Sequence, residues 1–404
     1  MNRDLLSLRP HASKAISDAA LLNPGLVNLS IGEASFGAPR KVLDALAGAL
    51  KSDGRPPPFN HYAHSRGTPG LRQAIARRYR RLYGVDVDPE TEVLVTHGAA
   101  EAIWLAVFTL TNAGDEVLLP DPCYVLYDGV VGSLGRKAVR LPTSARSGFQ
   151  ITPQQLRAAI TPTTRLLILN SPANPTGAFY DRDELAALLA VAAEAGITVL
   201  HDEVFDRVVF DGAHTPLASL DPGLGSTIMV NSLSKLYGMT GWRLGWMVAR
   251  RETVEQALKA HTYMSLAVAT IIQDAVTGAL NDTDVDAEVE RNVAELKQRM
   301  LRVKGELERI DGIEFPAGAP RGGFYLFPRV EGLARRLGLQ RDSASEAVVE
   351  FLTQRCGVAV VPGNVYGPCG EGHIRLVVAA PDSLLNQALG RIQHELAHIP
   401  AVRV

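Results

Sequence analysis

Strand-like and helix-like segments alternate through the middle of this 404-residue chain. The strand-like segments are short apolar runs that end in polar residues, and the helix-like segments between them are longer. Nearly continuous apolar strands that alternate with helices are typical of a parallel sheet buried on both faces. The predicted strands are 93–96, 116–120, 165–170, 197–202 and 227–232, and the predicted helices among them include 99–110 and 182–195. The middle of the chain is therefore expected to be an α/β domain.

A different pattern begins near residue 286. Apolar residues repeat at spacings of four and three up to Ile310, which predicts one long amphipathic helix. A coiled coil has the same spacing, but about three heptads that end at Asp311-Gly312 favour a helix lying on its own domain. The short strands predicted after it are 323–327, 357–361 and 373–378, and the helices are 343–355 and 384–398.

These two patterns predict a two-domain chain. The large α/β domain, with helices on both faces of a mostly parallel sheet, is expected at 41–289, and a smaller α+β domain is expected from 1–40 together with 290–404. The first forty residues are too few to form a core alone, so we expect them to pack on the small domain or on a partner.

The composition excludes several classes of function. Hydrophobic residues make up 46% of the chain and charged residues 21%, and the formal net charge is -2, so nothing attracts nucleic acid or an anionic membrane overall. No segment has the length of a membrane-spanning helix, and the N-terminus lacks the apolar run of a secretory signal. The spacing of Cys123, Cys356 and Cys369 is typical of free thiols in a reducing compartment. A soluble cytoplasmic protein is therefore expected.

The segment 232–245, SLSKLYGMTGWRLG, carries the clearest chemical signal. It places Lys235 among small and glycine residues and follows it with Arg243 eight positions later. A lysine amine can form a Schiff base with a carbonyl, and the planar arginine fork matches phosphate oxygens. Two surface charges would look the same, but the apolar runs on both sides of the segment indicate a buried setting. An aldehyde cofactor that carries a phosphate would suit this loop.

Three other loops after predicted strands add to this signal, because ligands of open α/β sheets bind at that edge. Ala99 and Ala100 open a helix whose free N–H groups can bind an anion, although small residues are common at helix starts. The turn 171–177, SPANPTG, presents the Asn174 amide, although such turns are usually structural. Asp202 ends an apolar strand, where a carboxylate needs a partner such as a backbone amide or a cationic ring nitrogen. Together with the lysine loop, these groups fit pyridoxal phosphate.

At this point the chain resembles a known family, the class I/II aminotransferases, which are fold-type I pyridoxal-phosphate enzymes. The resembling motifs occur in family order at 29–39, 62–76, 98–100, 171–177, 201–205, 232–245, 321–327 and 373–379. Eight motifs in order are far more specific than one. The resemblance implies a seven-stranded type of sheet in the large domain, and an obligate homodimer with shared active sites.

The resemblance also implies a role for each matched residue. Lys235 would form the Schiff base and act as the general base, and Asp202 would pair with the pyridine nitrogen. Asn174 would donate to the ring oxygen and contact substrate. The residues implied to hold the phosphate are Ala99 and Ala100 through their backbone amides, Ser232, Arg243, and Tyr62 of the neighbouring subunit.

Three further residues complete the implied site. Tyr124 would stack on the cofactor ring, although ordinary core packing would also explain it. Arg375, helped by the Gly32 backbone, would bind the substrate α-carboxylate in a bidentate manner. The expected reaction moves an amino group between an L-amino acid and a 2-oxo acid by a ping-pong mechanism.

One position departs from the family pattern. Phe205 stands where the family usually has a tyrosine whose hydroxyl bonds to the cofactor ring oxygen. Loss of that donor should raise the pKa of the cofactor Schiff base. It also leaves open a second outcome on the same cofactor, namely elimination, oxidation or cyclisation of an amino acid.

Substrate choice is less constrained. Ala100 occupies a position where some aspartate-using relatives have a lysine, which argues mildly against a dicarboxylate substrate. Another cation could serve from the partner subunit, with Lys14, Arg66 and Arg321 as candidates, although each is expected to be a solvated surface charge. A ligand-sensing module of a transcription regulator is disfavoured because no basic DNA-binding sequence precedes the core. No metal is expected, since His61 and His64 form a pair without a third ligand.

Overall fold

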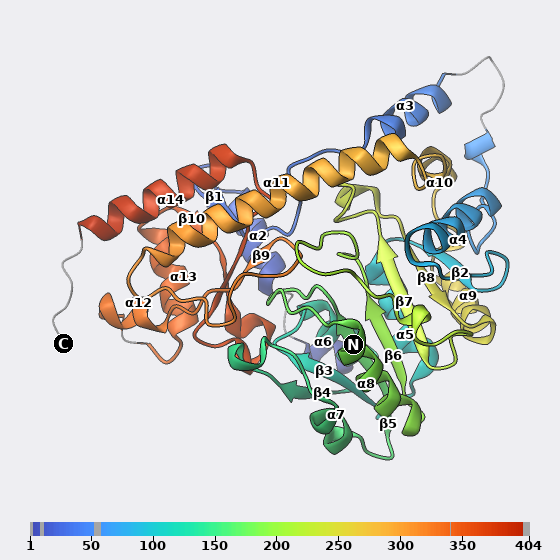
Figure 1. Ribbon diagram of the computed structural model, residues 1–404, viewed down its shortest axis with the longest axis horizontal. Helices are drawn as coiled ribbons and strands as arrows, with labels where there is room; N and C mark the ends of the chain where they lie inside the picture. The colour runs from blue at the N-terminus through green and yellow to red at the C-terminus, as the bar shows by residue number, and fades with distance from the viewer. Residues whose placement is uncertain (1–2, 9–11, 52–57, 340, 399–404) are drawn as a thin grey trace.

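A seven-stranded sheet forms the centre of the larger part of the molecule (Figure 1). The computed structural model describes residues 3–8, 12–51, 58–339 and 341–398. The strand order is β2-β8-β7-β6-β5-β3-β4, and only β8 runs antiparallel to its neighbours. The strands are β2 (Val93–Thr96), β3 (Glu116–Asp121), β4 (Lys137–Pro142), β5 (Thr164–Asn170), β6 (Thr198–Asp202), β7 (Thr227–Ser232) and β8 (Gly245–Ala249). The predicted α/β fold with a mostly parallel sheet is confirmed.

Apolar side chains bury both faces of this sheet. Along β5, Leu166 and Ile168 pack in one core cluster, while Leu167 and Leu169 pack in another on the opposite face. The helices of this part are α4 (Pro69–Tyr83), α5 (Ala99–Leu110), α6 (Val125–Ser133), α7 (Pro153–Ala159), α8 (Arg182–Glu194), α9 (Arg251–Ser265) and α10 (Thr270–Thr277). Burial on both faces explains why the strands are almost wholly apolar until their last residues.

The smaller part contains two short sheets. Strands β11 (Val361–Pro362), β12 (Ile374–Val377) and β9 (Tyr325–Leu326) form one antiparallel sheet, and β1 (Val27–Asn28) pairs in parallel with β10 (Val358–Ala359) in the other. The helices packed around them are α2 (Ala12–Leu21), α12 (Glu331–Arg336), α13 (Ala344–Gln354) and α14 (Asp382–Ala397). The predicted strand 357–361 is thus two strands that belong to different sheets.

Helix α11 (Thr283–Glu308) runs along both parts of the molecule (Figure 1). Asp282 caps its first turn by accepting from the N–H groups of Asp284 and Val285. Its buried stripe includes Val289, Leu296 and Leu307, and the helix packs on α14 and β9 of the same chain, as the spacing predicted. The proposed domain boundary after residue 289 therefore falls inside one continuous helix.

The N-terminal residues divide between the two parts. The β1–β10 pairing and the packing of α2 beside β10 support the proposal that 1–40 belongs with the small domain. Helix α1 (Arg3–Ser7) instead lies against α6 of the larger part, and α3 (Arg40–Ala49) packs on α10. Leu5 and Leu6 of α1 are 57% and 66% exposed, so packing of this helix on a partner stays a prediction.

The remaining elements are short. The 3-10 helices are η1 (Pro58–Asn60), η2 (Ala145–Ser147), η3 (Leu217–Ser219), η4 (Thr240–Trp242), η5 (Gly363–Tyr366) and η6 (Pro368–Gly370). Among the described residues, none of the helices combines the length and the apolar composition needed to cross a membrane.

Candidate active site

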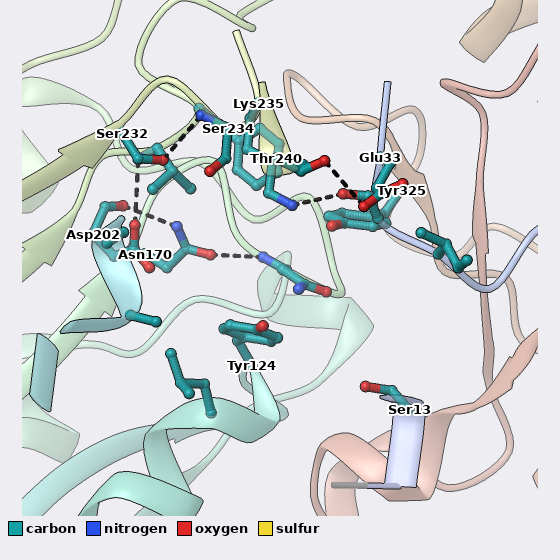
Figure 2. Close-up of a pocket in the computed structure, with 18 of the residues that line it drawn as sticks. Ser13, Glu33, Tyr124, Asn170, Asp202, Ser232, Ser234, Lys235, Thr240 and Tyr325 are labelled. Carbon is teal, nitrogen blue, oxygen red and sulfur yellow. Dashed lines mark hydrogen bonds between the residues drawn. The ribbon is translucent and has the colours of Figure 1, made fainter. Parts of the chain in front are cut away.

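A cavity of about 350 Å³ lies at the carboxyl ends of β5, β6 and β7 (Figure 2). One side is formed by residues at these strand ends and by the start of α5, and the other by the segment 30–33 together with Tyr325 and Arg375. Ligands of open α/β sheets bind at this edge because neighbouring parallel strands all end there.

Lys235 follows β7 and extends its amine into the cavity. Its Nζ donates to the backbone carbonyl of Gly32 at 2.6 Å. Burial, with help from the positive charge of Arg375, lowers the pKa of Lys235 to about 8, while Glu33 and Asp202 act in the opposite direction. At pH 7 roughly a tenth of this amine is neutral, far more than for an ordinary lysine, which makes it suitable as a nucleophile and as a general base.

Asp202 is the last residue of β6 and is only 4% exposed. Its Oδ2 accepts from the hydroxyl of Tyr127 at 2.8 Å, and its Oδ1 accepts from the Val204 N–H at 3.3 Å. Burial raises the pKa of Asp202 to about 6, and the Tyr127 hydrogen bond limits that rise. A buried carboxylate with few donors would be stabilised by a cationic group placed beside it.

Arg375 lies on β12 with its side chain buried. Its Nη1 donates to Asn174 Oδ1 at 3.2 Å, and its Nη2 donates to the carbonyl of Ser30. The guanidinium carbon lies 4.6 Å from the ring centre of Tyr325 and 5.2 Å from that of Tyr366. The Nε atom is buried and has no hydrogen-bond partner among the residues that the structure describes, so this arginine retains a donor for an anionic ligand.

The start of α5 forms an anion cradle with the lysine loop. Gly98 caps the helix with a φ of 78°, and the N–H groups of Ala99 and Ala100 lie in its first turn, where a helix leaves amides unpaired. A Cβ at Gly98 would lie 2.7 Å from Nη2 of Arg243, so only glycine lets the guanidinium approach the helix start. Ser232 lines the same end of the cavity.

The remaining predicted residues divide into two cases. Tyr124, Phe205, Gly32 and Asn174 all line the cavity, and the Phe205 ring packs edge-on against Phe324 at 5.0 Å and against Tyr325 at 5.8 Å. Tyr62 does not line it and is 84% exposed. The structure thus brings every predicted site residue into one cavity except Tyr62.

Comparison with known proteins agrees with this geometry. The model of the family described as aminotransferase class I and II matches residues 24–392. The chain is 36% identical to a probable N-succinyldiaminopimelate aminotransferase of Mycobacterium tuberculosis, over 98% of each chain. It is 33% identical to an aspartate aminotransferase of Pyrococcus horikoshii, over 92% of this chain and 90% of the relative. The structure of the Thermus thermophilus aspartate aminotransferase with maleate superposes with a TM-score of 0.89 at 31% identity, over 98% of this chain and 99% of that one.

The chain belongs to the class I and II aminotransferases. It is therefore a pyridoxal-phosphate-dependent enzyme that moves an amino group between an amino acid and a 2-oxo acid. The relatives are aminotransferases, and they give no support to elimination, oxidation or cyclisation as the main reaction.

This aminotransferase site also contains residues that the sequence reasoning missed. Asn170 is the last residue of β5 and lines the cavity, and Tyr127 of α6, three residues after the helix cap Tyr124, donates to Asp202. Both could have been found, the first from the end of its strand and the second from its i, i+3 spacing. Nothing in the local sequence indicates Glu33 or Tyr325, because tertiary packing alone brings them to the cavity.

The three cations proposed to recognise a substrate side chain lie in different places. Lys14 lines the cavity, with its Nζ 2.5 Å from the carboxylate of Asp18. Arg66 lies outside the cavity and donates to the carbonyl of Glu90, and Arg321 lies outside it and pairs with Asp181 at 2.8 Å. Of these three candidates, only Lys14 lines the cavity of its own chain.

Two His–Glu–His groups also escaped the sequence reasoning. One joins Glu101 to the Nδ1 atoms of His97 and His261, at 3.0 and 2.9 Å. The other places Nδ1 of His201 3.1 Å from Glu203. Hydrogen bonds to these carboxylates account for the positions of His97, His201 and His261, whereas Nε2 of His214 lies 3.5 Å from Glu203.

Proposed function

We propose that Lys235 is the reactive lysine of this aminotransferase and that Asp202 holds the cofactor ring. The observation that supports this most is the meeting of a pKa-lowered amine, a buried carboxylate and an unpaired Arg375 donor in one cavity. Perturbed ionisable groups that converge in a cavity are typical of catalytic sites.

The chemistry of the donor set fits pyridoxal phosphate. Arg243, Ser232 and the amides of Ala99 and Ala100 would hold a phosphate at the start of α5. Asp202 would keep a proton on the ring nitrogen, and Tyr124 would cover a ring face. The Asn174 amide is available to the ring oxygen, because its carbonyl side faces Arg375.

The residues of this chain would then share the work of transfer. Pyridoxal phosphate supplies an aldehyde that reacts with amines and a ring that withdraws electrons. Arg375 and the Gly32 backbone bind and orient the substrate α-carboxylate. The Lys235 amine then takes the proton from the α-carbon, as its pKa of about 8 allows.

We also propose that the preferred substrate is an L-amino acid with a neutral side chain. The cations that line the cavity among the described residues are Lys14, Lys235, Arg243 and Arg375. Three of them have the roles above, and Lys14 is paired with Asp18. Among the described residues of the same chain, a distal carboxylate therefore has no dedicated partner, whereas apolar Ile103 and Leu126 line the cavity.

A panel of amino acids tests this function and its substrate class. Loss of the cofactor's visible band on adding each amino acid, and its return on adding a 2-oxo acid, measures the two half-reactions. We expect neutral amino acids to exceed aspartate by about tenfold or more in kcat/KM, the size of effect that one charged contact gives. Aspartate as the best substrate would contradict the substrate proposal, and ammonia release without return of the band would contradict amino transfer.

We propose that the active enzyme is a homodimer in which Tyr62 reaches the partner's phosphate. Tyr62 is 84% exposed, and the apolar residues Tyr263, Met264 and Leu266 are 95%, 49% and 48% exposed. The Tyr62 loop contacts the start of α10, the helix that follows these residues, where Thr270 donates to the carbonyl of His61 at 3.0 Å. Exposed apolar side chains of this kind favour an interface.

Complementation between variant chains tests the shared site. The Lys235→Ala and Tyr62→Ala chains should each have weakened activity, and unfolding and refolding them together should restore one complete site per mixed dimer. Activity that stays at the level of the separate variants, or a monomeric mass in light scattering, would contradict the shared-site dimer.

We propose a cytoplasmic location, which is supported by the thiols. All three cysteines are free, and Cys123 and Cys356 are buried. Free buried cysteines are typical of a reducing compartment. Fractionation of cells with an antibody to the protein tests this, and recovery from an oxidising compartment would contradict it.

A further inference from the structure

Glu33 lies at the mouth of the cavity and takes no part in the roles assigned above. Its Oε1 accepts from the hydroxyl of Thr240 at 3.0 Å, and Gly32, the residue before it, accepts from the Lys235 amine at 2.6 Å (Figure 2). Thr240 comes five residues after Lys235, and its own carbonyl accepts from Arg243 at 2.9 Å. Glu33 therefore contacts the lysine loop between the reactive amine and the phosphate-binding arginine.

The segment that carries Glu33 is fixed to the small part of the molecule on both sides. The Leu29 carbonyl accepts from the Val377 N–H at 3.0 Å, and the Ser35 N–H donates to the Ala379 carbonyl at 2.8 Å. A Cβ at Gly32 would lie 2.3 Å from the hydroxyl oxygen of Tyr325, so the segment passes very close to β9. The Glu33–Thr240 bond joins this anchored segment to the lysine loop of the larger part.

We propose that Glu33 is a positioning residue for Lys235. Held by Thr240, its carboxylate keeps the Gly32 carbonyl against the lysine amine and stabilises the protonated form of that amine. This inference rests on the proposed role of Lys235. It assigns Glu33 no contact with substrate or cofactor.

The charges around Lys235 indicate how the Glu33 carboxylate acts on the lysine amine. Arg375 from β12 and Arg243 from the end of the lysine loop both disfavour a second positive charge, and the Phe324 ring lies 5.8 Å from the amine. The acids that favour the charge are Glu33 and Asp202, and Glu33 has the larger effect of the two on the pKa. Asp202 would face the cofactor ring, so Glu33 is the acid that stays available to the amine.

Acylation of the full-length, cofactor-free protein measures the Lys235 amine directly, without any turnover. The rate of Lys235 acetylation by acetic anhydride, followed by mass spectrometry of its peptide across a pH series, gives the pKa of the amine. Glu33→Gln keeps an oxygen for Thr240 but removes the charge. We expect the pKa to fall by about half a unit to one unit, with roughly three- to tenfold faster labelling at pH 6.5.

Two matched variants separate charge from shape. Glu33→Asp retains the charge and should give a pKa closer to that of the wild type than Glu33→Gln does. Thr240→Val removes the hydroxyl donor and retains the carboxylate, so its shift should be smaller than that of Glu33→Gln. Glu252→Gln removes the same charge from the exposed start of α9 and should leave the labelling curve unchanged.

Three results would overturn the proposal. These are an unchanged pKa in Glu33→Gln, a Glu33→Asp value as low as that of Glu33→Gln, and a larger shift in Thr240→Val than in Glu33→Gln. The labelling result is distinct from the role of Lys235 itself, because amino transfer that persists in Lys235→Ala would contradict that role whatever the labelling curves show.

Discussion

The two sides of the active site are built in different ways. On the sheet side, Asn170, Asp202 and Ser232 are the last residues of the adjacent strands β5, β6 and β7. On the covering side, Gly32, Tyr325 and Arg375 come from segments roughly 300 residues apart in the sequence. The sheet side is therefore fixed by the strand order, whereas the covering side depends on how the small sheets pack against the larger part.

This difference suggests a division of labour. The sheet side contains the groups that would hold the cofactor and move the proton, and their pKa values are shifted by burial. The covering side contains Arg375, which would recognise the substrate, and Glu33, which joins the two sides. Variants on the sheet side should therefore mainly change kcat, and those on the covering side should mainly change KM.

Lys235→Ala should have the largest effect. Removal of the amine abolishes the general base, so the rate of the amino-acid half-reaction should fall by about 10³- to 10⁴-fold in single-turnover absorbance measurements. Lys14→Ala, which removes another amine lining the same cavity, should cost less than tenfold. Lys235→Ala with more than a tenth of the wild-type rate would contradict the assignment of the base to the sheet side.

Arg375→Leu should have the next largest effect. Loss of a charge-assisted, bidentate partner should lower kcat/KM by about 10²-fold, mostly through KM, because the α-carboxylate contact belongs to binding. The loaded enzyme should keep its visible cofactor band, because Arg375 does not hold the cofactor. Arg375→Lys should recover only part of the loss, because an ammonium lacks the planar fork. A loss confined to kcat would break the division between the two sides.

The same division explains what the sequence alone could predict. The ends of β2 and β7 coincide with the predicted strands, because a strand buried on both faces stays apolar until the chain leaves the sheet. Asp202 and Lys235 were accessible to this reasoning, since adjacent parallel strands bring their loops together. Arg375 and Gly32 came only from the family resemblance.

Other features could not be derived from local spacing. No periodicity relates residue 33 to residue 240, so the Glu33–Thr240 bond appears only once the chain is folded. Strand β8 was not among the predicted strands, and its apolar run could not have shown that it is antiparallel, because hydrophobicity does not reveal strand direction. Helix α1 has five residues, too few for a pattern that would predict its position beside α6.

Asp202→Asn tests how much stability the protein loses by burying the Asp202 carboxylate on the sheet side of the active site. Burial raises the pKa of Asp202 in the folded protein to about 6, above the value of 3.8 for an exposed aspartate. The folded state is therefore most stable below pH 3.8, where Asp202 is protonated, and it loses stability as the pH rises through about 6 and the buried carboxyl group ionises. A pKa shift of about two units corresponds to a change of ~3 kcal/mol in the free energy of unfolding. The cofactor-free variant should therefore be more stable than the wild type by up to that amount at pH 7.5, and by nearly nothing at pH 3.5. Urea unfolding at both pH values measures this, and equal stability at pH 7.5 would contradict it.

Phe205→Tyr should have the smallest effect, and it probes the junction between the two sides. Phe205 follows Asp202 on the sheet side, yet its ring packs edge-on against Phe324 and Tyr325 of the covering side. A hydroxyl added here would donate to the cofactor ring oxygen and stabilise its ionised form, so the pKa read from the visible absorbance of the loaded enzyme should fall by about one unit. Phe205→Leu, which changes the packing without adding a donor, is the matched control. An unchanged or higher pKa in Phe205→Tyr would mean that another group already supplies this donor, and Tyr325, whose side chain lines the same cavity, would be the first to test.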